Sequence, residues 1–204
     1  MKYGNGTFSG TLAFYSANLS DRRNVQFIND PANPGGFIEK VDLQDTKSYG
    51  FEGTWNWRFA QGLSFNGGFT YQKHELTKSE NNPLFVGNKI ARQPDFMSKL
   101  GLAYDKSNFD LNLDYNYAGD KFTNDANTIK LDGFGIVDLG MGYTFSVGND
   151  KETLRLGVQS FNLFNSVGIT EGSPRLGENQ TEEEFFVGRP IIPRTAVVNL
   201  TFNF

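Results

Sequence analysis

Few side chains in this sequence have the chemistry that catalysis or metal binding requires. The chain contains no cysteine and a single histidine, His74, which excludes a thiolate site and a cluster of histidine ligands. Nucleophilic catalysis needs a nucleophile beside a base that a third group orients, and no motif of that kind involves His74. We therefore expect that the protein is not an enzyme, and we expect no catalytic residues, no metal site and no cofactor.

The remaining candidates lie between about Phe164 and Pro193, where charged, aromatic and glycine residues are mixed. A connection of this length within a compact domain is usually functional or disordered. The acidic run Glu182–Glu184 is typical of a solvated surface, so it is not interpreted as a cation site. We predict that this connection contacts a ligand, and the candidate ligand-binding residues are Glu171, Arg175, Phe186 and Arg189.

The end of the chain indicates what kind of element positions these residues. Residues 194–204 alternate apolar and polar side chains with a period of two, the pattern of a strand with one apolar face. A tilted strand needs about 9–11 residues to cross a bilayer, so one such strand fits a membrane barrel as well as a soluble sandwich. The apolar face of this last strand carries Ala196, Val198, Leu200, Phe202 and Phe204.

Seven earlier segments repeat this alternation, which predicts an all-β, antiparallel chain of about eight strands. Short turns near Gln61, Ser107 and Asn149 alternate with longer connections. Short turns on one rim and long loops on the other are typical of an outer-membrane β-barrel. The seven segments cover about residues 6–27, 37–59, 63–74, 96–105, 109–117, 137–147 and 154–159, and the longer connections cover about 29–36, 77–94, 120–132 and 164–193.

Charged and aromatic residues separate the membrane barrel from the soluble sandwich. A sandwich core could bury the charges on the polar strand faces only at a severe desolvation cost, whereas a wet lumen accommodates them. These charged residues are Glu52, Arg58, Lys99, Asp105, Asp110, Asp114, Asp138 and Arg155. Aromatic residues near the strand ends are typical of interfacial girdles. We predict as interfacial aromatics Trp55, Trp57, Phe59, Tyr104, Phe109, Phe145 and Phe204 near the short turns, with Tyr49, Phe69, Tyr71, Phe96, Tyr117 and Phe134 toward the long connections.

Several segments of the chain have a recognisable sequence, and the most specific are Leu156–Asn165, Ile169–Arg175, Phe186–Arg194 and Leu200–Phe204. These segments resemble the carboxy-terminal part of TonB-dependent outer-membrane receptors. The stretch Gly50–Glu52 before Trp55–Arg58, closed by Gly62 and Leu63, is similar to the strand-turn-strand pattern of that family. The resemblance implies that residues 1–204 are the carboxy-terminal portion of a barrel of about 22 strands with a plugged lumen.

The resemblance also carries expectations about function and partners. It implies part of an active-transport receptor for a scarce nutrient such as a ferric siderophore, in the outer membrane of a Gram-negative bacterium. The sequence has no recognisable signal peptide, TonB box or plug domain, so we expect that the chain is partial and that TonB–ExbB–ExbD acts through a missing amino-terminal part. The expected further partners are outer-membrane lipid and the barrel assembly machinery, which would read Phe202 and Phe204 as an assembly signal.

Two further observations limit the alternatives. The net charge of −4 provides no basic footprint for nucleic acid, so no nucleic-acid partner is expected. Eight strands suffice for a small barrel that side chains fill. A self-closed eight-stranded barrel, acting as a membrane anchor or surface-interaction protein, is therefore the alternative to a transport receptor.

Overall fold

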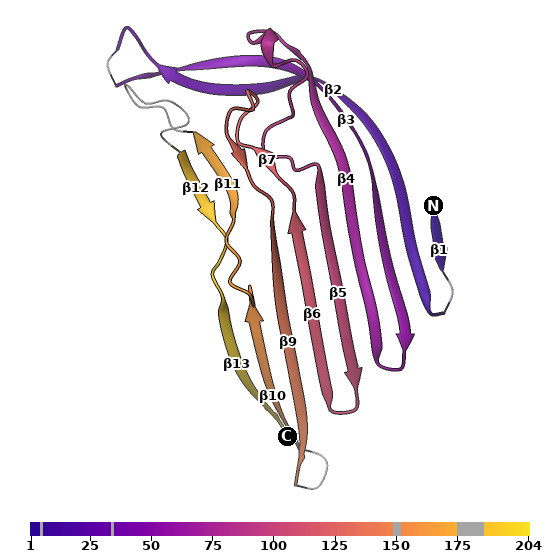
Figure 1. Ribbon diagram of the computed structural model, residues 1–204. Helices are drawn as coiled ribbons and strands as arrows, with labels where there is room; N and C mark the ends of the chain where they lie inside the picture. Colours follow the sequence, from indigo (N-terminus) through magenta and orange to yellow (C-terminus); the bar gives the residue numbers. More distant parts are fainter. Residues whose placement is uncertain (5, 34, 149–151, 175–185) are drawn as a thin grey trace.

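The computed structural model describes residues 1–204 except Asn5, Pro34, 149–151 and 175–185. The described chain is all-β, and nine antiparallel strands form one curved, open sheet in the order β1-β2-β3-β4-β5-β6-β9-β10-β13 (Figure 1). The strands are β1 (Lys2–Gly4), β2 (Phe8–Asn29), β3 (Phe37–Ala60), β4 (Leu63–Ser79), β5 (Phe96–Lys106), β6 (Phe109–Ala118), β9 (Phe134–Val147), β10 (Glu152–Phe161) and β13 (Thr195–Asn203). The predicted all-β antiparallel fold is confirmed, and β1 is an additional short strand.

Two small hairpins lie in the longer connections. β7 (Lys121–Phe122) pairs with β8 (Lys130–Leu131), and β11 (Ile169–Pro174) pairs with β12 (Phe186–Pro190). Part of the connection over residues 164–193 therefore forms an antiparallel ladder, which the sequence analysis did not predict. The only helix in the described part of the chain is the 3₁₀ turn η1 (Pro83–Phe85), and no described helix has the length and apolar character to cross a membrane.

The strand register aligns the apolar residues into one continuous face. Each ladder pairs an outward apolar residue with another on the next strand, so the period of two is kept across the sheet. The eight charged residues named from the sequence all lie on the opposite face, as predicted. One apolar row runs from β4 to β13 through Leu63, Tyr104, Leu111, Met141, Val158 and Val198.

Glycines on the polar face let long side chains lie flat across the neighbouring strand. A Cβ atom at Gly142 of β9 would lie 2.1 Å from Nη1 of Arg155, so only glycine leaves room for this guanidinium. Arg155 crosses β9 at this point and donates hydrogen bonds of 2.5 and 2.9 Å to the carboxylate of Asp110 on β6. Asn199 of β13 lies over Gly157 of β10 in the same way. The contact between Arg155 and Asp110 thus connects β10 with β6, which are not neighbours in the sheet.

β2, β3 and β4 continue well past the apolar band, with 22, 24 and 17 residues against nine in β13. The β2–β3 and β3–β4 ladders both shift register opposite residues 44–46 of β3. β2 has an extra residue near Asp21, whose φ is +56°, and β4 has an extra residue near Thr77. Bulges bend and twist a strand. Beyond this level the β2–β3 hairpin runs across the end of the sheet that carries the longer connections (Figure 1). We call this part, residues 22–29 and 37–44, the distal hairpin.

The bulges also change which residues face the lumen side. Below them, the odd-numbered residues of β2 and the even-numbered residues of β4 share the polar face with Glu52. Above them, Arg22 pairs with Gln44, and Gln44 pairs with Ser79. The alternation is therefore inverted in both strands, so that Arg22 and Asn24 of β2 and Ser79 of β4 face the polar side.

Two expectations about the sheet need correction. Phe134 is not a lipid-facing girdle residue, because it lies on the polar face, where a Cβ atom at Gly168 would lie 2.6 Å from its ring. A self-closed eight-stranded barrel is not observed, since β1 and β13 form the two edges of the sheet and do not pair with each other among the described residues.

Candidate functional site

Buried polar side chains gather at the end of the sheet where the longer connections lie. A single sheet layer has few buried residues, so burial here means that connections pack against the polar face of the extended strands. The buried apolar side chains among the described residues are few and include Leu76 and Leu131. The buried polar residues are Asp42, Gln44, Thr46, Gln72, Ser79, Thr123, Asp125 and Asn162. We call the network built around Asp42 and Asp125 the rim network.

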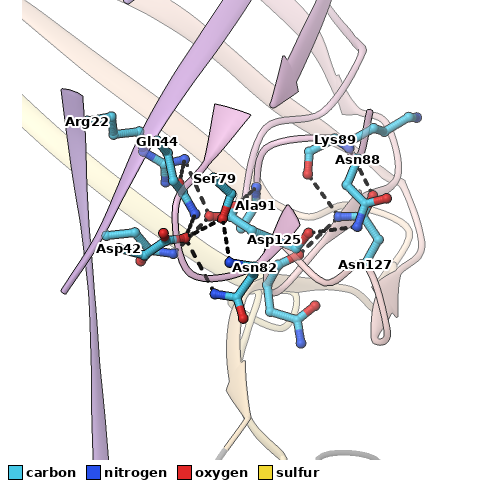
Figure 2. Close-up of polar contacts among 12 residues, drawn as sticks. Arg22, Asp42, Gln44, Ser79, Asn82, Asn88, Lys89, Ala91, Asp125 and Asn127 are labelled. Carbon is cyan, nitrogen blue, oxygen red and sulfur yellow. Dashed lines mark hydrogen bonds and ion pairs between the residues drawn. The ribbon is translucent and has the colours of Figure 1, made fainter. Parts of the chain in front are cut away.

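Asp42 of β3 anchors the start of the connection between β4 and β5. Its Oδ2 accepts hydrogen bonds from Gln44 Nε2 (3.0 Å), Ser79 Oγ (2.6 Å) and Asn82 Nδ2 (3.4 Å), and its Oδ1 accepts one from the backbone N–H of Asn81 (2.9 Å) (Figure 2). Burial opposes ionisation, but these hydrogen bonds outweigh it and hold the pKa of Asp42 below its ordinary value. Four neutral donors thus stabilise a buried carboxylate.

Asp125, between β7 and β8, joins three separate segments. Its carboxylate accepts hydrogen bonds from Arg22 Nη1 (3.4 Å) and Asn24 Nδ2 (3.1 Å) of the distal hairpin and from the backbone N–H of Ala91 (2.8 Å). Arg22 Nη1 also donates to Gln44 Oε1 at 3.1 Å, which connects Asp125 to the Asp42 cluster (Figure 2). The distal hairpin, the β4–β5 connection and the β7–β8 connection are therefore held together.

Asn127 and Lys89 add a further link of the rim network between the β7–β8 and β4–β5 connections. Asn127 accepts a hydrogen bond from the backbone N–H of Lys89 (3.0 Å) and donates one to its carbonyl (2.8 Å), so one amide pairs with one residue's backbone (Figure 2). Lys89 Nζ donates to Asp95 Oδ2 at 2.6 Å, and this contact raises the pKa of Lys89. A second ion pair joins Lys130 Nζ to Asp120 Oδ2 at 3.1 Å, and the contact with Lys130 lowers the pKa of Asp120.

Asn162 organises the chain after β10. Asn162 and Asn165 both have positive φ, 51° and 54°, a conformation that asparagine tolerates better than most residues. The Asn162 side chain donates to the carbonyls of Ser166 (2.9 Å) and Ile192 (3.0 Å), and its Oδ1 accepts from the N–H of Ser166. Its own N–H donates to Asp138 Oδ1. This turn gives a physical reason for the Asn-Leu-Phe-Asn sequence at positions 162–165.

The structure brings together two of the four predicted ligand-binding residues. Glu171 of β11 forms ion pairs with Arg189 of β12 (3.6 Å) and with Arg92 of the β4–β5 connection (3.1 Å). Phe186 begins β12, where its backbone is in register with Pro174. Arg175 lies outside the described residues. The role of these residues in ligand binding stays a prediction.

The predicted interfacial aromatics form pairs on the apolar face. Ring centroids are 5.9 Å apart for Trp55 and Phe65, 5.2 Å for Trp57 and Phe59, 6.0 Å for Tyr104 and Phe109, 4.6 Å for Tyr143 and Phe145, and 6.1 Å for the stacked Phe202 and Phe204. An apolar groove on this face is lined by Tyr3, Phe8, Trp55, Trp57, Phe65 and Phe69, among others. Its place among outward-facing residues argues against a pocket for a water-soluble ligand.

The sequence family described as TonB dependent receptor-like, beta-barrel matches residues 1–163. The chain belongs to this family. The sheet of this TonB-dependent receptor chain also resembles solved receptors. The ferric yersiniabactin uptake receptor FyuA from Yersinia pestis has a TM-score of 0.73 at 17% identity, over 100% of this chain and 29% of that one. BauA, the ferric preacinetobactin receptor from Acinetobacter baumannii, has a TM-score of 0.72 at 21% identity, over 100% and 28%.

A third solved structure extends the comparison. The ferric citrate transporter FecA, in its unliganded form, has a TM-score of 0.73 at 16% identity, over 98% of this chain and 29% of that one. At these identities the likeness shows the fold alone. The chain spans less than a third of the length of each of these receptors. No curated protein matches it.

Sequence reasoning missed most of the rim network of this TonB-dependent receptor chain. Asp42 and Gln44 lie in an alternating stretch with Val41 and Leu43, so a polar face was detectable there, but nothing in it marks a loop contact. Asp125 lies in a polar loop without a motif. No group of three or more acidic or histidine residues suited to a metal ion occurs within the described ranges.

Proposed function

We propose that this chain is the carboxy-terminal part of the barrel of an outer-membrane nutrient receptor in a Gram-negative bacterium, with residues 1–204 forming one barrel segment. We propose further that the receptor imports a scarce nutrient such as a ferric siderophore and that the TonB–ExbB–ExbD complex energises it through a part of the receptor outside this sequence. The observation that carries the proposal is the overlay of at least 98% of the chain on iron-complex receptors from different bacteria.

The two faces of the sheet support the same function. A continuous apolar face with paired aromatics suits lipid, and a charged opposite face suits a wet passage. Strands β5, β6, β10 and β13 have 9–11 residues, the length that a tilted membrane strand requires. The rim network supports the function in a different way, because it holds the longer connections in fixed positions at one end of the sheet. Binding surfaces are commonly formed by such loops on a rigid scaffold.

Growth under iron limitation tests the proposal. The complete receptor gene containing these residues is deleted, and the strain is supplied with single ferric siderophores of catecholate, hydroxamate and carboxylate chemistry. Loss of growth or of labelled-iron uptake on one of them, restored by the complete receptor but not in a strain without TonB, is the expected result. Uptake that is unchanged by the deletion, for iron complexes and for other scarce nutrients such as copper complexes or cobalamin, would refute the proposal.

A further inference from the structure

The apolar face of the sheet contains a groove that crosses β1, β2, β3 and β4. Its volume is about 510 Å³, within the range of about 300–1,000 Å³ that is typical of ligand sites. Atoms of apolar side chains form most of its lining. The strand register arranges the lining in three rows: Phe8, Trp57 and Phe65 nearest the short turns, then Tyr3, Gly10 and Trp55, and then Leu12, Gly53 and Phe69.

Two glycines at the centre of these rows explain the hollow. Gly10 and Gly53 contribute no side chain to the outward layer of β2 and β3. A Cβ atom at Gly53 would lie 2.7 Å from Cε1 of Phe69, so this ring lies against the glycine rather than projecting from the sheet. Trp55 covers Gly67 of β4 in the same way. Farther along the sheet, full side chains continue the row of Gly10 through Leu100, Tyr115 and Val137.

The glycines and the flattened rings favour an occupant of the groove. Glycine within a strand costs conformational entropy and packs no side chain, and it often marks a place where a ligand approaches closely. The flattened rings leave a shallow surface beside Tyr3 and Trp57, which are 59% and 47% exposed. An unfilled hollow forfeits dispersion contacts of the atoms that line it. An occupant of matching shape restores these contacts.

The dimensions of the groove indicate which occupant fits. From Phe8 to Leu12 it extends about 13 Å, at about 3.3 Å per residue, and four strands about 4.8 Å apart give a width of about 14 Å. One leaflet contributes about 15 Å of hydrocarbon, half of the core of about 30 Å, so the groove lies within the leaflet on the side of the short turns. A stable protein interface buries about 1,200–2,000 Å², several times the groove's area of about 200 Å². An acyl chain is narrow and flexible enough to lie along it.

We propose that this groove binds one acyl chain of a phospholipid, in the leaflet on the side of the short turns. The inference rests on the proposed function, since it requires that the apolar face lies in the outer membrane. Tyr3 and Trp57 combine an apolar ring with an O–H or N–H donor, the chemistry of residues at the membrane–water interface. Both therefore suit the ester and phosphate groups at the end of the chain. Bulk lipid is as apolar as the groove, so the site selects by shape and by these donors.

Native mass spectrometry of the complete receptor in detergent tests the site by counting bound lipids. The probe is a phosphatidylethanolamine with palmitoyl and oleoyl chains, added at increasing molar ratio to receptor stripped of lipid. We expect one molecule to bind at ratios at which further molecules do not. Leu12→Trp places a large ring opposite Gly53 and fills the groove, so it should lower the affinity for this first lipid by about tenfold.

Two variants outside the groove serve as matched controls. Leu113 of β6 is also a leucine on the apolar face, and its side chain and that of Leu12 are both 36% exposed. Leu113→Trp should therefore leave the affinity for the first lipid unchanged. Trp57→Leu removes a ring of the groove together with its N–H donor and should weaken binding about threefold or more. Tyr143→Leu removes another exposed aromatic from the apolar face, on β9, and should not weaken binding.

Heat-modifiable gel mobility shows that each variant barrel is assembled before lipids are counted. Binding without a preferred first molecule, or a first lipid that Leu12→Trp affects no more than Leu113→Trp does, would overturn the proposal. Lipopolysaccharide or a second copy of the receptor, bound with the same sensitivity to Leu12→Trp in place of the phospholipid, would assign the groove to a different occupant and refute it as well.

The failure of this inference is distinguishable from failure of the proposed function. TonB-dependent uptake by a receptor that holds no preferred lipid would refute only the lipid site. A first lipid that is lost in Leu12→Trp, in a receptor whose deletion changes no uptake, would support the site and refute the transport function.

Discussion

Replacing Asp125 by alanine should release the β7–β8 connection and the distal hairpin from each other. The Asp125 side chain is 4% exposed and accepts hydrogen bonds from Arg22, Asn24 and the N–H of Ala91. Without it, the Arg22 guanidinium, itself only 29% exposed, loses its carboxylate partner, and a backbone donor is left unsatisfied. A hydrogen bond to a charged group contributes about 1.5–3 kcal/mol, and we expect a loss of about 3 kcal/mol because water replaces part of the set.

Amide hydrogen exchange of the folded receptor in detergent measures this effect directly. A loss of about 3 kcal/mol in local opening free energy corresponds to roughly 100-fold faster exchange for the protected amides of residues 119–131 and 88–92. Asp125→Asn retains one acceptor oxygen and should cause a smaller increase, about tenfold. The membrane-spanning ladders do not depend on Asp125, so heat-modifiable gel mobility should stay the same.

Asp132→Ala is the matched control, because Asp132 is an exposed carboxylate directly after β8. We expect its exchange pattern to match that of the wild type. If Asp125→Ala exchanges no faster than this control, or if exchange rises uniformly over the whole barrel, Asp125 does not hold these segments together.

Three further expectations concern other parts of the chain. The folded pKa of Asp42 lies below its ordinary value of 3.8, so the contribution of this carboxylate to stability is fully present above that pH and is lost as the pH falls through the lower folded value. Amide protection of residues 79–82 should therefore be constant from about pH 7 to 5 and decrease below 3.8. The variant Asp42→Asn should lack this pH dependence. Gly142→Ala should displace Arg155 from Asp110 and lower the unfolding free energy in urea by about 1–3 kcal/mol, and a double-mutant cycle with Arg155→Met should show that most of this loss requires the guanidinium. Deleting Phe204 from the complete receptor should reduce the inserted amount on heat-modifiable gels while ligand affinity of the inserted molecules is unchanged; normal insertion would contradict its role as an assembly signal.

The strands could be predicted from the sequence because lipid on one face and water on the other impose a strict period of two. The predicted bounds 96–105 and 109–117 differ by one residue from β5 and β6. The start of β9 was harder to predict, since Phe134 and Ile136 place apolar side chains on the polar face and break the alternation there. Local patterning thus succeeds where a side chain faces only lipid or lumen, and fails where a connection packs on it.

The rim network could not be predicted for two physical reasons. Its partners are distant in sequence, as with Arg22 and Asp125, which are 103 residues apart. In addition, extending the alternation of Phe8, Leu12 and Phe14 along β2 would place Arg22 on the lipid side. The pairing of Glu171 with Arg189 lies within one connection, whereas Arg92, the other partner of Glu171, lies in a different connection and carries no local signal.

The paired bulges in β2 and β4 set a rule for exchanging outer segments between receptors. A single residue added to or removed from β2 near Asp21 reverses which side chains of the rest of that strand face inward and which face outward. The extra residue near Thr77 has the same effect on β4. A graft of the distal hairpin must therefore be joined above the bulge of β2 or include it, and a graft that also exchanges the end of β4 must treat the bulge near Thr77 in the same way. A graft that carried over only one of the two bulges would turn the side chains of one strand outward, while those of the other strand still faced the lumen. A sequence alignment of such segments must place the one-residue gap of β2 at this bulge, because a gap elsewhere in β2 would align residues that point to opposite faces of the sheet.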